Sequence, residues 1–563
     1  MIPTKHHINL GMPKHLVNLD ALILREDLEI LSPDASKPST GGPVGNFLIG
    51  NLEMGQPMFE VLRKPHFQRD TCQWTPEQIV QLVKNFLDEE LIPAIIFWKS
   101  PSSKNIFVID GAHRLSALIA WIHDDFGDKS LSEKLFGSNP DDIPKAQRQA
   151  AKLTRELFEK EGIGSYASLK SYIASSAGKS DEKSLRARNI ASVQIITQTV
   201  PNDAAHAEAS FYRINQGGAV LDDTEAEIIQ KRARPEAVAA RAIHRAGTGN
   251  KYWKRFIPEK QAKVEELSRQ IYNLLYKPEI EEPYRTIDFP MGGRGYNSNT
   301  LAICYELIHL CNELSRPLSE KKKKRVFLPL PPNDPLKDSS GDTTIEYLKS
   351  VKKISEIIAS EEHCSLGLHP AIYSYSATGK FQPAGLFAQV ELIKRLKSKD
   401  GFFEFTSCRK QFEDFLIEYR YFLNQLVGGQ GGMTRGLKLL VILHETVLKG
   451  ISDGKTNEQI RNEVVIDERF KQHLRIVPLG QESSKKSFSQ ATKAAIRLRD
   501  FLKAAALCPI CGARLYPHAT SIDHKVRLQD GGSSGRDSDG QTTHPYCNTG
   551  YKEKLNSLQQ TKA

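Results

Sequence analysis

The segment CPICGARLYPHATSIDHKVRLQDGGSSGRDSDGQTTHPYCNTGY, residues 508–551, holds the clearest chemical pattern in the sequence. Cys508 and Cys511 are separated by two residues, and so are His544 and Cys547. Three thiols and one imidazole in two such pairs match the ligand set of a structural tetrahedral zinc site. Because the spacing within each pair is short, both members can point at one ion, which would close the long loop between them. We therefore predict a small domain stapled by Zn²⁺ at these four residues.

The loop between the two pairs contains Asp523-His524 and, further on, Gly531-Gly532. One interpretation is a zinc ribbon that only holds its own fold. The order of the residues favours another interpretation: a hydrophobic residue, Asp-His, a basic and glycine-rich turn, and then Cys-Asn. This order resembles the HNH (ββα-metal) nuclease family.

The resemblance implies a second, catalytic metal site beside the zinc. His524 would be the general base that activates water, and Asp523 and Asn548 would hold a Mg²⁺ or Mn²⁺ ion. Asp539 stands where the family usually has an asparagine. A neutral imidazole can accept a proton near neutral pH, and a hard cation with open positions stabilises charge on a phosphate. Many relatives also have a basic residue three positions after Asn548, where this chain has Tyr551.

Composition describes a globular protein of about three to four domains. The 563 residues are 39% hydrophobic and 26% charged, and the net charge is +10, which mildly favours a polyanionic partner. No apolar run is long enough to cross a bilayer, and the N-terminus lacks the apolar core of a signal peptide. We expect a cytoplasmic protein with no membrane partner, whose five cysteines outside the zinc pairs form no disulfide framework.

Residues 1–44 include a Pro/Gly/Ser run and predict a linker or loosely packed arm. A helix is predicted after it, with Thr75 as N-cap and Pro76 at its first position. Two β-rich runs, at 92–98 and 105–109, follow this helix. The second run leads directly into Asp110-Gly111-Ala112-His113-Arg114 and another helical pattern, which predicts a strand, a glycine turn and a helix.

A turn at a helix N-terminus suits a phosphate, because free N–H groups and the positive end of the helix dipole face it. Alone, this turn is more typical of a purely structural connection. Together with Phe67-Gln68-Arg69 and Phe211-x-x-Ile-Asn, it resembles the ParB/sulfiredoxin-like N-terminal domain of GmrSD-type restriction endonucleases. The resemblance covers residues 45–235, with a charged helical insertion near 128–185. It implies a nucleoside triphosphate site built from Arg69, Asp110, Gly111, His113, Arg114 and Asn215.

Residues 236–483 predict a helical connecting domain, since apolar residues recur at three and four positions. The segment GISDGKT at 450–456 has one residue too few between its glycines for a phosphate-binding loop and predicts a helix-ending turn. The last domain, 484–563, opens with a basic helix that could contact a DNA backbone. Its basic residues are Lys485, Lys486, Lys493, Arg497 and Arg499.

The sequence as a whole predicts an α+β multidomain protein. Its predicted function is that of a bacterial defence endonuclease which senses modified or invading DNA. Its HNH domain would hydrolyse double-stranded DNA under control of the nucleotide-binding domain, and cutting both strands would need a homodimer or two events. Two alternatives stay open. One is a ParB-like, nucleotide-dependent DNA clamp whose C-terminus is a structural zinc knuckle, and the other is an enzyme whose main activity is the N-terminal NTPase.

Overall fold

The computed structural model describes residues 15–28, 41–136, 143–201, 203–217, 223–280, 286–295, 299–314, 334–428, 433–474 and 488–560. The basic segment KKKKR at 321–325, Lys485 and Lys486 lie outside these ranges, as do residues 1–14 and 29–40 of the predicted N-terminal arm. The chain forms two compact units, one made of residues 1–261, 297–302 and 317–341 and the other of the remainder. None of the described helices is both long and apolar enough to cross a membrane.

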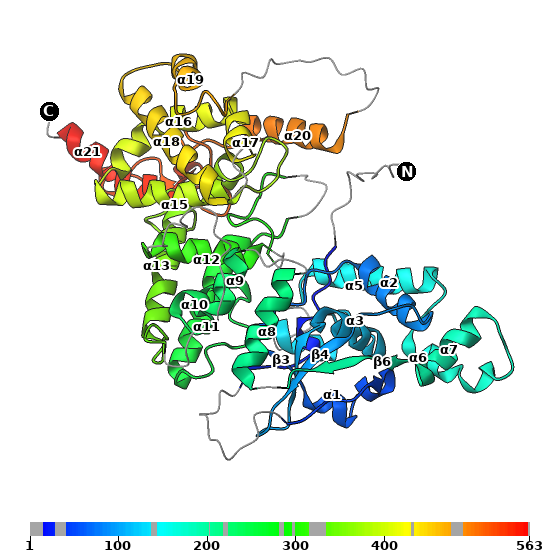
Figure 1. Ribbon diagram of the computed structural model, residues 1–563. Helices are drawn as coiled ribbons and strands as arrows, with labels where there is room; N and C mark the ends of the chain where they lie inside the picture. The colour runs from blue at the N-terminus through cyan, green and yellow to red at the C-terminus, as the bar shows by residue number, and fades with distance from the viewer. Residues whose placement is uncertain are drawn as a thin grey trace. The chain divides into compact units, whose positions relative to one another are not determined.

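A mixed five-stranded sheet organises the first unit (Figure 1), in the order β1-β3-β5-β4-β7. Its first three strands in this order are parallel, whereas β4 runs antiparallel to β5 and parallel to β7. These strands are β1 (Arg25–Glu26), β3 (Leu62–Pro65), β4 (Ile95–Lys99), β5 (Ile106–Asp110) and β7 (Thr197–Thr199); β2 (Phe47–Leu48) pairs with β6 (Gln194–Ile195) in a separate ribbon.

Both faces of this sheet are buried, as the unbroken apolar run at β5 shows. Ile106 and Val108 join one hydrophobic cluster, and the alternating Phe107 and Ile109 join another. The helices of the first unit are α1 (Pro57–Val61), α2 (Pro76–Leu87), α3 (Ala112–His123), α4 (Ser130–Phe136), α5 (Lys145–Lys160), α6 (Tyr166–Ser171), α7 (Glu182–Ser192), α8 (Ala204–Gly217), α9 (Asp223–Gln230) and α10 (Pro235–His244).

Helix α2 confirms the start that the sequence predicts. The Thr75 hydroxyl accepts a hydrogen bond from the Gln78 amide, and the Gln78 side chain reciprocates in a capping box. Apolar residues recur at helical spacing along it at Ile79, Leu82, Val83, Phe86 and Leu87, and all are buried except Leu82, which is half-buried. The predicted strand-turn-helix is also present, as β5, Gly111 and α3.

The prediction of a loosely packed N-terminal arm is wrong for residues 15–28, which are packed against the domain. Val17, Leu19, Leu22 and Ile23 are at most 3% exposed and belong to the same cluster as α2 and α3. The sequence did not reveal this packing. The apolar residues lie before the Pro/Gly/Ser run, in a stretch too short to show the periodicity of a helix or a strand.

The second unit is mainly helical, as the periodicity predicts, apart from one small hairpin. Its helices are α11 (Pro258–Tyr276) and α12 (Thr300–Cys311), which both begin in the first unit, then α13 (Asp342–Ile358), α14 (Pro370–Tyr373), α15 (Pro383–Ser398), α16 (Phe402–Glu418), α17 (Tyr421–Gly428), α18 (Met433–Ser452), α19 (Asn457–Ile466), α20 (Gln490–Ala504) and α21 (Lys552–Gln560). The predicted helix-ending turn follows α18, with Gly454 at φ +74°.

The apolar pattern over 409–426 is that of one helix, but the structure has two, α16 and α17, which are separated at residues 419–420. The break falls at Arg420, which is 8% exposed and donates hydrogen bonds to the carbonyls of Ala371 and Tyr375. A buried guanidinium needs such acceptors. They lie 45 and 49 residues away in the chain, so no local pattern could reveal them.

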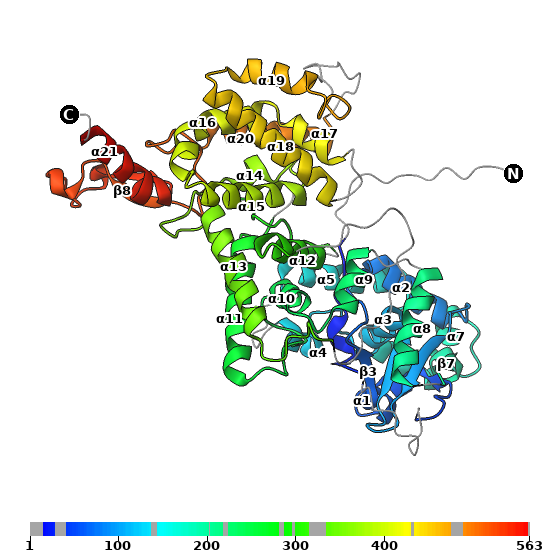
Figure 2. The same cartoon turned by 60° about the vertical axis from the view of Figure 1, so that its left-hand side comes forward.

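The C-terminal module consists of a hairpin followed by a helix (Figure 2). Strands β8 (Ser521–His524) and β9 (Gly540–Thr543) are antiparallel, with Asp523 opposite Gln541 and His524 opposite Gly540. A π-helical turn over Cys547–Tyr551 leads into α21. The order β-β-α is thus present around the predicted site.

Candidate functional site

The four predicted zinc ligands converge. The ligand atoms of Cys508, Cys511, His544 and Cys547 all lie within 4.8 Å of one another. Two ligands about 2.1–2.3 Å from a tetrahedral ion stand about 3.5–3.8 Å apart. The distances from His544 Nδ1 to the sulfurs of Cys511 and Cys547 are 3.4 Å and 3.8 Å. The donor chemistry and the spacing therefore fit Zn²⁺.

The orientation of His544 supports the same conclusion. Its Nε2 lies 3.0 Å from the carbonyl oxygen of Arg514, which can only accept a hydrogen bond. Nε2 therefore carries the proton, and the lone pair of Nδ1 faces the thiols. A backbone acceptor that fixes the tautomer in this way is typical of metal-bound histidines. The side chain is fully buried, so the imidazole is held in this orientation.

The second predicted site lies on the hairpin beside this cluster. Asp523 is 4% exposed and accepts a hydrogen bond of 2.9 Å from the Gln541 amide. His524 is half-buried, and its Nε2 lies 2.8 Å from the Ser534 hydroxyl. The amide nitrogen of Asn548 donates to the Ile522 carbonyl at 3.2 Å, which ties the π-helical turn to β8. Asp523 and His524 on β8 and Asn548 on the π-helical turn thus lie on two elements that are hydrogen-bonded to each other.

The resemblance implies a basic residue at the position of Tyr551, and in the structure the next residue, Lys552, places a positive charge at the predicted site. Its Nζ lies 2.8 Å from both carboxylate oxygens of Asp523 and 2.9 Å from the His524 carbonyl. A π-helical turn adds one residue to the turn that follows Cys547. Lys552, four positions after Asn548, therefore reaches Asp523. Sequence spacing missed this contact because it assumes an ordinary α-helical turn.

Asp539 immediately precedes β9. Its carbonyl accepts a bond of 2.9 Å from the Lys525 amide, which places it across the hairpin from the residue after His524. Its Oδ2 is buried and has no hydrogen-bond partner among the described residues. A buried carboxylate oxygen without a donor is costly unless water or a cation meets it.

In the first unit, the predicted phosphate turn is built around Gly111. Its φ is +91°, a backbone conformation that residues with a side chain rarely adopt, so the turn strongly favours glycine. Arg114 donates to Asp110 at 2.9 Å and to the Ala94 carbonyl at 3.2 Å. The guanidinium that the resemblance assigns to phosphate binding is therefore paired with Asp110.

The other predicted residues of this site are more dispersed. His113 stacks on Trp74 with ring centroids 5.8 Å apart. Burial, with the positive charges of Lys64 and Arg69, lowers the pKa of His113 to about 4, so this imidazole is neutral at physiological pH. Arg69 Nε lies 3.5 Å from Glu225. The Asn215 amide donates to the Phe211 carbonyl within its own helix, α8.

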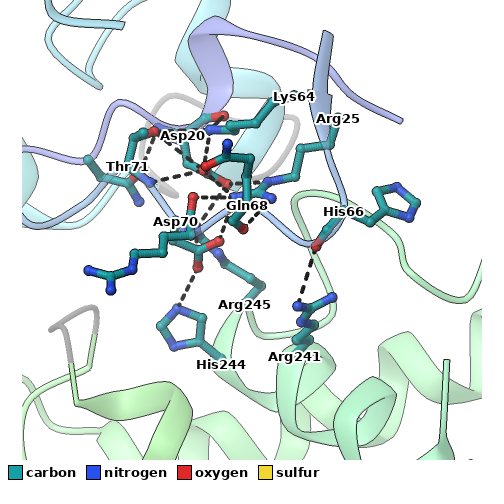
Figure 3. Close-up of polar contacts among 12 residues, drawn as sticks. Asp20, Arg25, Lys64, His66, Gln68, Asp70, Thr71, Arg241, His244 and Arg245 are labelled. Atoms are coloured by element: carbon teal, nitrogen blue, oxygen red, sulfur yellow. Dashed lines mark hydrogen bonds and ion pairs between the residues drawn. The ribbon is translucent and has the colours of Figure 1, made fainter. Parts of the chain in front are cut away.

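A buried ionic network that the sequence did not predict supports the Gln68-Arg69 loop (Figure 3). Arg25 donates to the carbonyls of Pro65, Gln68 and Arg69 and pairs with Asp20 and Asp70. Lys64 and Arg245 also pair with these carboxylates, and His244 Nε2 lies 3.4 Å from Asp70. Residues 20, 64 and 245 are too far apart in sequence for any motif to connect them.

Replacing Asp20 with Asn is expected to destabilise the protein by about 3–5 kcal/mol, because it leaves buried cations unpaired. Burial alone would raise the pKa of Asp20, but Arg25, Lys64 and Arg245 outweigh it and hold that pKa well below its ordinary value. The stabilisation is therefore present above about pH 3.9, the unfolded value, and is lost as the pH falls through the lower folded pKa. Urea unfolding of wild type and Asp20→Asn at neutral pH measures the difference. Equal stability would show that the network contributes nothing.

Residues 48–232 match the family described as GmrSD restriction endonuclease, N-terminal domain. No curated protein matches the chain, and no solved structure does. The matched range contains four of the five strands of the sheet, all except β1, together with the Gly111 turn, the Gln68-Arg69 loop and Asn215. The chain thus carries a GmrSD-type N-terminal domain over residues 48–232, which points to a defence protein of the restriction-endonuclease kind.

Proposed function

We propose that the C-terminal module is an HNH-type nuclease centre that hydrolyses DNA phosphodiester bonds. One observation carries the proposal: Asp523-His524 lies on a β-hairpin joined to the Asn548 turn, and this turn begins at Cys547, one of the four clustered zinc ligands. The β-β-α order around these residues supports the family resemblance. The match of residues 48–232 to a restriction-endonuclease family supports DNA as the substrate.

In the proposed reaction, the half-buried imidazole of His524 takes a proton from the attacking water. Asp523 and Asn548 would hold a Mg²⁺ or Mn²⁺ ion, which would neutralise charge on the scissile phosphate. The donor set fits such an ion, since the buried Asp523 carboxylate already attracts a cation, the ammonium of Lys552, to both of its oxygens. The hairpin, held by the zinc cluster, keeps the base and the carboxylate on neighbouring positions.

Replacing Lys552 with Gln is expected to lower the Mg²⁺ concentration that half-saturates cleavage severalfold. The Lys552 ammonium occupies both oxygens of Asp523 and so competes with a divalent ion for them. Initial rates of plasmid nicking across a Mg²⁺ titration measure this. Lys503→Gln, on an exposed position of α20, is the matched control. A higher half-saturating concentration in Lys552→Gln would contradict the competition and indicate that Lys552 orients Asp523.

The N-terminal domain is proposed to bind a nucleoside triphosphate near Gly111 and to control the nuclease. An unrestrained nuclease would damage host DNA, so control of this kind has an evident purpose. Asp110→Ala is expected to abolish the response of nicking to nucleotide, because Asp110 holds Arg114 beside the turn. Nicking with and without ATP or GTP measures the response, with Glu77→Ala at an exposed position of α2 as control. An unchanged response would defeat the gating proposal.

Matched plasmids, plain and modified, incubated with Mg²⁺ or Mn²⁺ and with or without each triphosphate, test the function as a whole. We expect metal-dependent nicking that EDTA abolishes, and double-strand breaks only after two events or dimerisation. DNA binding without any cleavage would favour the ParB-like clamp with a zinc knuckle. Phosphate release without cleavage would favour an enzyme whose activity is the N-terminal NTPase.

A further inference from the structure

A hollow of about 830 Å³ lies between α15, α16 and α18 of the second unit. These helices pack against one another (Figure 2). Pockets for small organic ligands span about 300–1,000 Å³ and are mostly apolar with a few placed polar groups. The walls here follow that pattern, with Leu392 and Leu396 from α15, Phe405 from α16, and Val441 and Ile451 from α18.

His444 supplies a polar group in the wall of this hollow. The side chain is 7% exposed, and its Nδ1 is buried with no hydrogen-bond partner among the described residues. Its ring packs edge-on against Phe412, with centroids 5.4 Å apart. Burial lowers the pKa of His444 to about 4, with Arg395 adding to the effect, so the imidazole is neutral. A buried nitrogen without a partner is costly, and a polar group on a ligand would remove that cost once the ring turns Nδ1 toward the hollow.

The charges that line the hollow sum to zero. Arg395 on α15 forms an ion pair with Glu445 on α18, and the remaining charged lining residues, Lys399 and Glu404, have opposite signs. A charged ligand would have to disrupt this balance, whereas an uncharged ligand would not. The lining therefore selects for an uncharged molecule that is mainly apolar.

Helix α16 connects this hollow to the zinc module. Gly401, Glu404, Phe405 and Cys408 line the hollow at helical spacing. The turn that carries them presents two other rings to the module: Phe402 lies 5.9 Å from Tyr546 and Phe403 lies 4.9 Å from Tyr551, between ring centroids. Further along the same helix, Asp414 pairs with Arg514 at 2.7 Å, and the Arg514 carbonyl accepts the bond from His544.

We propose that this hollow binds a small, uncharged and mainly apolar molecule that hydrogen-bonds His444, and that α16 transmits its occupancy to the zinc module. The helical region would then act as an effector-binding domain rather than only as a connection. Any effect on cleavage rests on the proposed nuclease function. The tests below use no cleavage, so they can succeed where that function fails.

Binding is tested with 2-naphthol, an apolar bicyclic probe with one hydroxyl, by saturation-transfer NMR on the full chain. We expect binding to wild type and none to Leu448→Trp, which fills the hollow from α18. Lys449→Trp adds the same ring at an exposed neighbouring position and should bind normally. His444→Phe should bind about 2–10-fold more weakly, the effect of one hydrogen bond. Thermal melts establish that each variant is folded. Equal binding to wild type and Leu448→Trp, or none to wild type, would overturn the proposal.

Transmission is tested by filling the hollow covalently. Cys408 lines it and is half-buried, so N-phenylmaleimide is applied to the Cys364→Ser protein, which lacks the exposed thiol. Peptide mass spectrometry confirms the label at Cys408, and Cys408→Ser with Cys364→Ser is the unlabelled control. We expect amide hydrogen exchange over 544–552 to change by about fivefold or more, and exchange over α2 in the first unit to stay constant. Labelling at Cys408 with unchanged exchange over 544–552 would refute transmission.

Discussion

Replacing His524 with Ala is expected to reduce Mg²⁺-dependent nicking of plasmid DNA by about 10²–10⁴-fold, the usual contribution of a general base. The side chain is half-buried, and its described hydrogen bond is to the Ser534 hydroxyl. Its loss should therefore leave the fold and the zinc content intact. Initial nicking rates at saturating Mg²⁺, together with zinc analysis of the same samples, separate a chemical defect from a folding defect.

His518→Ala is the matched control for this experiment. His518 lies in the loop before β8 and has a half-exposed side chain. Its Nε2 is 4.0 Å from a carboxylate oxygen of Asp288. Its removal should leave nicking unchanged. If His524→Ala nicks DNA at the wild-type rate, the C-terminal module is not an HNH centre, and the clamp with a zinc knuckle becomes the better description.

Replacing Cys547 with Ser is expected to unfold the C-terminal module and abolish cleavage. The hydrophobic cluster of this module contains only Cys508, Leu515 and Cys547 as buried members, with two partly buried neighbours. So small a core cannot hold a fold by itself. Structural zinc contributes an apparent binding free energy of about 10–16 kcal/mol in zinc-finger peptides, and that energy is folding energy. Loss of one ligand removes most of it.

Three measurements follow this unfolding: zinc per chain, limited proteolysis over 508–560, and nicking. We expect zinc content to fall from about one ion per chain to near zero, and rapid proteolysis within the module. Cys364→Ser removes an exposed thiol that is not in the cluster and should behave as wild type. A Cys547→Ser protein that retains zinc and resists protease would show that the module folds without Cys547 as a zinc ligand.

Much of the local structure was predictable because its causes lie within a few residues. The capping box at Thr75, the apolar face of α2, and the strand, turn and helix around Gly111 all depend on near neighbours. The packing of residues 15–28 was not predictable in this way. Asp20 and Arg25 are buried because they meet partners on β3, in the Asp70 loop and just after α10, and the arm prediction failed for that reason.

In the candidate sites, sequence found residues but not all of their partners. The order of Asp523, His524 and Asn548 was visible, whereas the contact of Lys552 with Asp523 required the π-helical turn. Arg114 was expected to face a phosphate and is paired with Asp110. The hollow beside His444 belongs to three helices that any periodicity analysis treats separately.

The sequence by itself determined the four candidate zinc ligands that cluster in the structure, because two pairs of soft ligands, each separated by two residues, need only short-range geometry to point at one ion. It also determined the α+β class and most of the helices, since apolar periodicity is a local property. Only the tertiary structure decided which charges are buried together, where Lys552 lies, and that α15, α16 and α18 enclose a hollow. Those features come from contacts between residues distant in the chain, and such contacts leave no local pattern.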